Sequence, residues 1–181
     1  MKHALIVGPR LVGKTTLINK VLEELDLPAY GFQTKKEASL TNEKKEAPTY
    51  IYELGKPKSQ SKENLVGYCN PMKGSTTISG VFNNFAPKIM EPISGAGIIL
   101  FDEIGFMEAK EEKFCKAILS RLDGDIPVIA AVKDKAGYEF LEKIKNHPKC
   151  RCFYITEENR DELFSEVLNF LLKQIKSTDR L

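Results

Sequence analysis

The sequence predicts an α/β domain in which a mainly parallel sheet carries helices on both faces. A glycine-rich segment, residues 8–16, lies between a short apolar run and a stretch with helical periodicity. A second apolar run begins at residue 97 and ends in two carboxylates, at residues 102 and 103. After residue 97, strand-like runs alternate with helix-like segments, which is the pattern of a parallel sheet with right-handed crossovers.

The expected elements follow one another along the chain, and apolar periodicity supports them. We expect strands at 4–7, 30–34, 49–54, 66–69, 97–102, 127–132 and 152–155, and helices at 14–26, 76–90, 107–122, 137–146 and 160–175. Residues 35–64 differ, because they are polar and rich in lysine and glutamate. This segment predicts a β-hairpin extension with long solvated loops, so we expect a mixed sheet.

The composition predicts a single domain over residues 1–181, because a chain of 181 residues can build one sizeable core. With 27 Lys and Arg against 25 Asp and Glu, the net charge of +2 gives no general attraction to nucleic acid or membranes. No apolar run approaches the roughly 20 residues of a membrane span, and the first strand begins too early to leave room for a signal peptide. Cys69, Cys115, Cys150 and Cys152 fit no zinc spacing, which favours reduced thiols and a cytoplasmic location. The oligomeric state stays open.

The glycine-rich segment consists of Gly8, Pro9, Arg10, Leu11, Val12, Gly13, Lys14, Thr15 and Thr16. It fits the pattern G-x-x-x-x-G-K-S/T, which indicates a phosphate-binding loop when it follows a strand and begins a helix. Backbone N–H groups of such a loop, together with the helix N-terminus, attract the negative charges of a triphosphate. We expect Gly8 and Gly13 to permit the positive φ angles and the close backbone approach that such a loop requires. We also expect Lys14 against the β- and γ-phosphates and the Thr15 hydroxyl on Mg²⁺.

The second apolar run places two carboxylates, Asp102 and Glu103, at the end of a strand. Ligands of open α/β sheets bind beyond the carboxyl ends of the strands, so we expect Asp102 to face Mg²⁺ and its waters. Glu103 follows directly, where a carboxylate can accept a proton from an attacking water. The alternative is that Glu103 only caps or solubilises the start of the next helix.

Five motifs occur in the same order as in a known family. They are Gly8–Thr16, Gly31-Phe32-Gln33-Thr34, Val66-Gly67-Tyr68, Asp102-Glu103-Ile104-Gly105-Phe106-Met107-Glu108 and Thr156-Glu157-Glu158-Asn159-Arg160-Asp161. On these motifs the chain resembles, over nearly its whole length, the nucleoside-triphosphatase family typified by thermophile enzymes and a cancer-related human member. The resemblance implies a RecA-like P-loop fold and Mg²⁺-dependent hydrolysis of nucleoside triphosphates with broad tolerance of the base. It also implies that Gly8–Thr16 and Gly97–Gly105 bind nucleotide.

Three places depart from the usual pattern of that family. Arg10 and Leu11 stand where small residues are usual, Phe106 stands where a lysine is usual, and Lys35-Lys36-Glu37 replaces an E-V-R stretch. Two cationic positions are therefore lost or moved, which concerns the rate of hydrolysis more than nucleotide binding. Arg10 either replaces one of them near the γ-phosphate or faces solvent.

The leading hypothesis is a Mg²⁺-dependent enzyme that hydrolyses nucleoside triphosphates, with Lys14 and Glu103 as catalytic residues and Thr15 and Asp102 at the metal. Arg160 follows a strand and either stacks on the base or belongs to a segment that only starts the last helix. A first alternative is a small-molecule or nucleotide kinase in which Glu103 serves a substrate hydroxyl, although arginine is scarce for such an enzyme. A second alternative is a nucleotide-binding regulatory switch with negligible turnover. Residues 132–135 read V-K-D-K rather than the guanine-reading N-K-x-D, so guanine selectivity is not supported.

Overall fold

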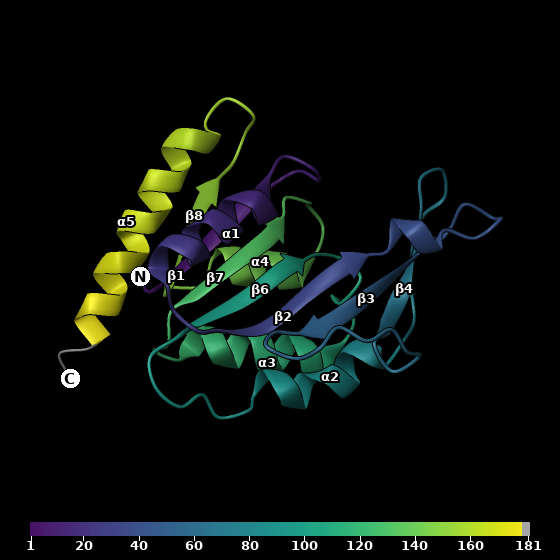
Figure 1. Ribbon diagram of the computed structural model, residues 1–181, viewed down its shortest axis with the longest axis horizontal. Coiled ribbons are helices and arrows are strands. Elements are labelled where there is room, and N and C mark those ends of the chain that lie inside the picture. The colour runs from purple at the N-terminus through teal and green to yellow at the C-terminus, as the bar shows by residue number, and fades with distance from the viewer. Residues whose placement is uncertain (179–181) are drawn as a thin grey trace.

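The computed structural model describes residues 1–178, which contain an eight-stranded sheet with the order β5-β4-β3-β2-β6-β7-β1-β8. The strands are β1 (His3–Gly8), β2 (Ala29–Lys36), β3 (Ala47–Glu53), β4 (Leu65–Asn70), β5 (Gly74–Thr77), β6 (Ile98–Ile104), β7 (Val128–Lys133) and β8 (Cys150–Tyr154). The helices are α1 (Lys14–Leu25), α2 (Val81–Ile89), α3 (Glu112–Asp123), α4 (Glu139–Lys145) and α5 (Arg160–Thr178), with a short 3-10 helix η1 (Ala38–Leu40). Figure 1 shows the twisted sheet with helices on both of its faces. The predicted mixed α/β architecture is confirmed.

Five strands form the parallel half of the sheet and end at one edge. β2, β6, β7, β1 and β8 pair with one another in parallel. Strands that are buried on both faces need continuous apolar runs, and every residue of β1 is buried. α1 and α5 pack on one face of the sheet around Ile18 and Val167, whereas α2, α3 and α4 pack on the other around Phe82, Phe114 and Leu141.

Three further strands form an antiparallel extension of the sheet. β3 pairs with β2, β4 with β3, and β5 with β4. The predicted hairpin corresponds to β2 and β3, and its tip carries η1 (Figure 1). The extension is larger than one hairpin, because β4 and β5 continue it as an antiparallel meander.

The helix expected at 76–90 is shorter than predicted. It begins at Val81, and β5 occupies the residues before it. β-Branched threonines in β5 favour a strand. Gly80, with a φ of 86°, holds a left-handed conformation at the start of the helix and prevents its extension toward the N-terminus. Ile78 therefore lies outside the helix and is 36% exposed.

The helix expected at 107–122 also begins later, at Glu112. The residues before it form a loop after β6, in which Met107 and Glu108 are buried. The loop is fixed by the Glu108 carboxylate, which accepts a hydrogen bond from the Gly105 N–H. The predicted apolar face is confirmed for Phe114, Ile118 and Leu122.

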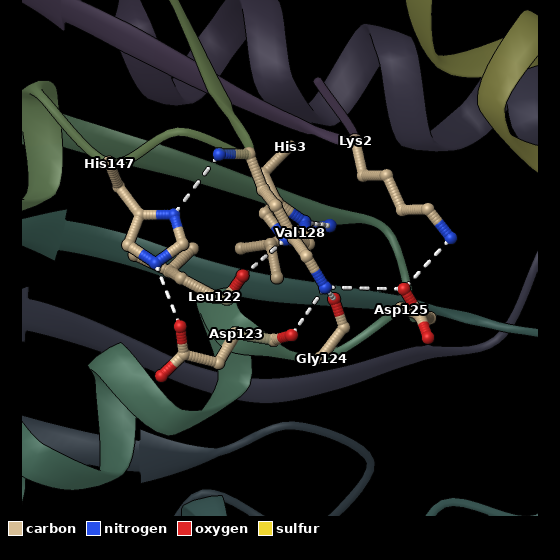
Figure 2. Close-up of polar contacts among 9 residues, drawn as sticks. Lys2, His3, Leu122, Asp123, Gly124, Asp125, Val128 and His147 are labelled. Atoms are coloured by element: carbon tan, nitrogen blue, oxygen red, sulfur yellow. Dashed lines mark hydrogen bonds and ion pairs between the residues drawn. The ribbon is translucent and has the colours of Figure 1, made fainter.

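A buried histidine, His3, joins the amino ends of β1 and β7. Its Nε2 donates to the carbonyl oxygen of Leu122 at 2.8 Å, and its Nδ1 accepts the Val128 N–H at 3.2 Å (Figure 2). Burial lowers the pKa of His3 to about 4, and the cations nearby act in the same direction. His3 is therefore a neutral structural residue at the end of the sheet opposite the glycine-rich loop.

The four cysteines are free thiols, as expected. Burial raises the pKa of both Cys115 and Cys150 to about 12. Since the thiolate is the reactive form, this shift keeps both thiols protonated at neutral pH. Within residues 1–178, no helix is both long and apolar enough to cross a lipid bilayer.

Candidate active site

The carboxyl ends of the central parallel strands meet beside the glycine-rich loop. Gly8 at the end of β1 lies opposite Lys133 at the end of β7. In the next part of the sheet, Gln33 of β2 lies opposite Asp102 of β6. These strands run in the same direction, so their last residues line the edge where α/β proteins bind ligands.

The loop between β1 and α1 uses its two glycines in different ways. Gly13 has the predicted positive φ, 105°, directly before α1. Gly8 does not have a positive φ, so that part of the prediction is wrong. Close packing requires a glycine there, because a Cβ would lie 2.8 Å from Ile155 Cγ2. The loop also holds Leu11 at a φ of 64°, a strained conformation for an L-residue that costs on the order of 1 kcal/mol.

Lys14 is the first residue of α1 and is 7% exposed. Its Nζ donates to the carbonyl oxygens of Gly8 at 2.8 Å and Pro9 at 2.5 Å. Burial lowers the pKa of Lys14, while the charges of Glu103 and Asp102 oppose that shift. The ammonium group is thus held against the carbonyls of its own loop, and phosphate oxygens would compete with them.

Thr15 and Asp102 are in direct contact. Thr15 Oγ1 donates to Asp102 Oδ1 at 3.0 Å, and Gln33 Nε2 donates to Asp102 Oδ2 at 2.9 Å. Gln33 is held in turn by Lys58, whose Nζ donates to Gln33 Oε1 at 2.8 Å. Asp102 is 3% exposed; burial raises the pKa of its carboxyl, and the bonds from Gln33 and Thr15 oppose that shift.

This oxygen pair suits a hard divalent cation. Mg²⁺ is usually held by one or two protein oxygens together with phosphate oxygens and waters. Within residues 1–178, no group of three or more His, Cys, Asp and Glu side chains is arranged to hold a metal ion. A cation at Thr15 and Asp102 would therefore depend on oxygens from a phosphate ligand and from water.

Glu103 lies on an irregularity of β6. The strand does not end at residue 102 as expected but continues to Ile104. From Phe101 to Ile104 it has three steps, whereas β7 has two from Ala130 to Val132, so one residue is extra. Glu103 takes up the bulge with a φ of 78°. Bulges next to active sites re-aim side chains, and Glu103 Oε1 lies 2.8 Å from Lys133 Nζ.

Most of the predicted site residues line one cavity of about 450 Å³ at the head of α1. They are Arg10, Leu11, Gly13, Lys14, Thr15, Thr16, Asp102 and Glu103. Gly8 and Pro9 reach this cluster through their carbonyl bonds to Lys14. Val12 does not line the cavity, because its side chain is 6% exposed and packs in the core under α1 and α5.

Arg160 lies on the other side of the loop, at the first position of α5. A Cβ at Gly13 would lie 3.2 Å from Arg160 Cδ, so the arginine stem covers the glycine. Arg160 lines a separate cavity of about 380 Å³ together with Thr16 and Lys20. A guanidinium plane at this position can stack on an aromatic base.

The residues that depart from the usual family pattern lie in or near the site or form ion pairs. Arg10 is exposed and lines the cavity at the head of α1. Lys35 is paired with Glu37 at 3.3 Å. Two lysine ammonium groups lie over the ring of Phe106. The Nζ of Lys133 is 5.0 Å from the ring centroid, and the Nζ of Lys135 is 4.4 Å from it. Cations therefore gather around the phenylalanine.

Two residues of the site were not singled out from the sequence, Gln33 and Lys133. Each is polar and lies near the carboxyl end of a predicted parallel strand. That is the same signal that singled out Asp102 and Glu103. Applied to every strand of the parallel half, it would have found both residues.

A glycine loop at the head of a helix, beside a carboxylate-bearing strand of a mainly parallel sheet, defines a P-loop nucleotide-binding protein. The family model described as NTPase matches residues 3–168, and the chain belongs to this family.

The chain is similar to the nucleoside-triphosphatase THEP1 of Methanocaldococcus jannaschii, with 30% identity over 94% of this chain and 98% of the relative. The THEP1 of Thermotoga maritima is 32% identical over 92% of this chain and 94% of the relative. Among solved structures, THEP1 from the hyperthermophile Aquifex aeolicus matches with a TM-score of 0.72 and 24% identity, over 93% of this chain and 98% of that chain. A human cancer-related nucleoside triphosphatase matches with a TM-score of 0.70 and 21% identity, over 93% and 96%. These structures confirm the fold.

Proposed function

We propose that this protein hydrolyses nucleoside 5′-triphosphates to the diphosphate and phosphate in a Mg²⁺-dependent reaction. The contact between Thr15 and Asp102, 3.0 Å long at the head of α1, carries the proposal. It brings the two oxygens that suit Mg²⁺ next to the phosphate loop and leaves Glu103 as the adjacent residue. The nucleoside triphosphatases among the relatives support the same reaction class.

In this proposal the loop binds the triphosphate before any chemistry takes place. The backbone N–H groups of the loop and of the first turn of α1 face the phosphate oxygens. Lys14 exchanges its bonds to the carbonyls of Gly8 and Pro9 for bonds to the β- and γ-phosphates. Mg²⁺, held through Thr15 and Asp102, would supply positive charge to the phosphates. These contacts stabilise charge where it develops in the transition state.

Glu103 then acts as the general base. A water oxygen attacks the γ-phosphorus and its proton passes to the Glu103 carboxylate. The bond between the γ-phosphorus and the β–γ bridging oxygen breaks, and the diphosphate leaves with that electron pair. The Glu103 side chain is half-buried, and its exposed part, 36%, allows water to reach it.

The identity of the substrate's nucleobase is expected to have little effect on kcat/KM. The contacts described for the phosphates do not involve it, and the cavity beside Arg160 offers a stacking plane that every base can use. We therefore expect a spread of less than about tenfold in kcat/KM among the four common ribonucleotides, or roughly 1.4 kcal/mol.

One observation favours the kinase alternative. A second cavity of about 290 Å³ begins at Glu103 and runs toward the antiparallel extension. Thr34 lines it, and the Thr34 hydroxyl is buried without a hydrogen-bond partner in the described part of the chain. An acceptor hydroxyl bound there would reach Glu103 in place of water.

Phosphate release from ATP, GTP, CTP and UTP, with and without Mg²⁺ and without any acceptor, decides among these functions. Steady release from all four nucleotides, only with Mg²⁺, is the expected result. Tight binding without release would favour the regulatory switch. A hundredfold preference for one nucleobase, or formation of diphosphate without free phosphate when a hydroxyl compound is added, would favour a dedicated kinase.

A further inference from the structure

We infer that Lys133 is a positioning residue for the hydrolysis proposed above, and that it holds the Glu103 carboxylate in place through their ion pair. The inference rests on the proposed role of Glu103 as general base. It assigns to the end of β7 a function that neither the glycine loop nor the carboxylate motif contains.

The position of Lys133 follows from the sheet. Lys133 is the last residue of β7 and lies opposite Gly8, the first residue of the loop. Its Nζ reaches Glu103 Oε1 at 2.8 Å, and the two side chains are only 20% and 36% exposed. An ion pair that is partly shielded from water is worth more than one on the open surface.

Lys133 is itself held on two sides. A Cβ at Gly105 would lie 2.8 Å from Lys133 Cδ, so the stem of the lysine crosses the glycine directly. Its ammonium lies 5.0 Å from the centre of the Phe106 ring, which attracts a cation. The Phe106 ring packs in turn against Tyr138, with ring centres 6.0 Å apart. These contacts therefore fix the position of the Lys133 side chain.

The Glu103 side chain has its ion-pair partner on the neighbouring strand, β7. The residue sits in a β-bulge with a left-handed φ of 78°. Among the described residues, Lys133 is its one ion-pair partner. With Oε1 paired to Lys133, Oε2 is left to accept the proton of the attacking water. A base misplaced by about 1 Å can cost on the order of 10²-fold in rate.

The chain offers a matched control in Lys135. Its ammonium lies over the same Phe106 ring, at 4.4 Å, and over Tyr138 at 5.5 Å, but the residue is exposed and forms no ion pair with Glu103. A loss that came only from removing a cation near the ring would appear in both lysine variants.

The test compares Lys133→Met, Lys133→Arg and Lys135→Met by kcat, KM, affinity for a fluorescent ATP analogue, and melting temperature. For Lys133→Met we expect kcat to fall roughly 10- to 100-fold, with KM, affinity and melting temperature close to wild type. Lys133→Arg should restore most of kcat, and Lys135→Met should behave as wild type. If Lys133→Met keeps wild-type kcat, or if it loses affinity as much as kcat, the inference is wrong.

A double-mutant cycle with Glu103→Gln separates this inference from the proposed function. If Lys133 acts through Glu103, Lys133→Met should cost little more in a Glu103→Gln background. Equal cost in both backgrounds would mean that Lys133 acts independently and would overturn the inference. If Glu103→Gln itself keeps normal turnover, the proposed base is wrong. If Glu103→Gln loses turnover and Lys133→Met does not, only the present inference fails.

Discussion

The two ends of the parallel half of the sheet differ in the polar groups of β1 and β7, which are neutral and enclosed at one end and charged and open at the other. At the amino end, His3 of β1 and Val128 of β7 are joined by a hydrogen bond of 3.2 Å, and the imidazole is neutral and enclosed. At the carboxyl end of the same two strands, Gly8 and Lys133 lie opposite each other beside a cluster of charges. The same pair of strands therefore ends in a satisfied structural contact on one side and in an open charged site on the other.

The difference shows where the molecule keeps groups that are poised for a ligand. At the amino end, polar groups have fixed partners, such as Asp125, which pairs with Lys2 at 2.9 Å and with Lys149 at 3.3 Å (Figure 2). At the carboxyl end, Glu103 is strained and Lys14 is turned back on carbonyls of its own loop. Strain of this kind collects at functional sites. Substitutions at the carboxyl end should therefore change binding and chemistry, and those at the amino end should change stability.

The largest effect is expected for Lys14→Ala. In the proposed function the Lys14 ammonium binds the β- and γ-phosphates, so its removal should lower affinity for a fluorescent ATP analogue by on the order of 10³-fold or more. The fold should survive, although Gly8 and Pro9 lose a hydrogen-bond donor. Thermal unfolding without nucleotide serves as the control. A variant that binds triphosphate like the wild type would show that the loop is wrongly assigned.

At the amino end, acid should destabilise the protein through His3. Burial lowers its pKa to about 4 from an unfolded value of 6.5. As the pH falls, the unfolded chain therefore binds the proton before the folded protein does. The contribution of His3 to the free energy of unfolding is complete above pH 6.5 and is lost as the pH falls toward 4. It amounts to roughly 3 kcal/mol, since each pKa unit corresponds to about 1.4 kcal/mol.

Urea unfolding of wild type and His3→Asn between pH 7 and pH 4 measures this contribution. His3→Asn should be less stable at pH 7, and the difference between the two proteins should shrink as the pH falls. His147→Gln replaces the other histidine of the chain and should retain the acid-dependent loss. A constant difference between wild type and His3→Asn across the range would contradict the account.

A smaller effect is expected for Asp102→Asn. The amide keeps a hydrogen-bond partner for Thr15 but removes the negative charge that we propose faces the cation. Mg²⁺ should bind roughly 10- to 100-fold more weakly, and turnover should recover as the Mg²⁺ concentration is raised. A Mg²⁺ titration of phosphate release provides the measurement. If the lost activity does not respond to Mg²⁺, Asp102 is not at the metal.

The smallest effect is expected on the outer side of the loop. Arg160→Ala removes a stacking plane but no phosphate contact, so we expect less than about a tenfold rise in KM, similar for all four nucleotides. Steady-state kinetics with each nucleotide measures it. A large loss in kcat would place Arg160 at the phosphates instead of the base.

The parts of the molecule that could be predicted from sequence are those in which local patterns and tertiary packing agree. Buried strands such as 97–102 and 127–132, and the helix that begins at Lys14, follow directly from apolar periodicity and the loop motif. The extent of the antiparallel extension could not be predicted. β5 is a short strand of polar residues, so no alternation marked it, and only its pairing with β4 defines it.

The composition of the site was predicted less completely than its location. The loop and the two carboxylates have a chemistry that can be recognised from the sequence. Gln33, although part of the motif Gly31-Phe32-Gln33-Thr34, and Lys133 had no predicted role and reach the site through strand pairing. The bulge at Glu103 was also unpredictable, because it arises where β6 and β7 fall out of register. Single-turnover measurements of phosphate release would show how much Lys133, Gln33 and the bulge contribute to the rate of hydrolysis.

The most direct test of the proposed chemistry is the turnover of Glu103→Gln at saturating Mg²⁺–ATP, measured together with its affinity for nucleotide. Glutamine keeps the shape of the side chain and its hydrogen bonding but cannot take a proton. We expect near-normal affinity and a loss of roughly 10²–10⁴ in kcat, the usual contribution of a positioned general base. Near-normal turnover would contradict it. Glu108, a buried carboxyl whose pKa burial raises to about 7, would then be the next base to test.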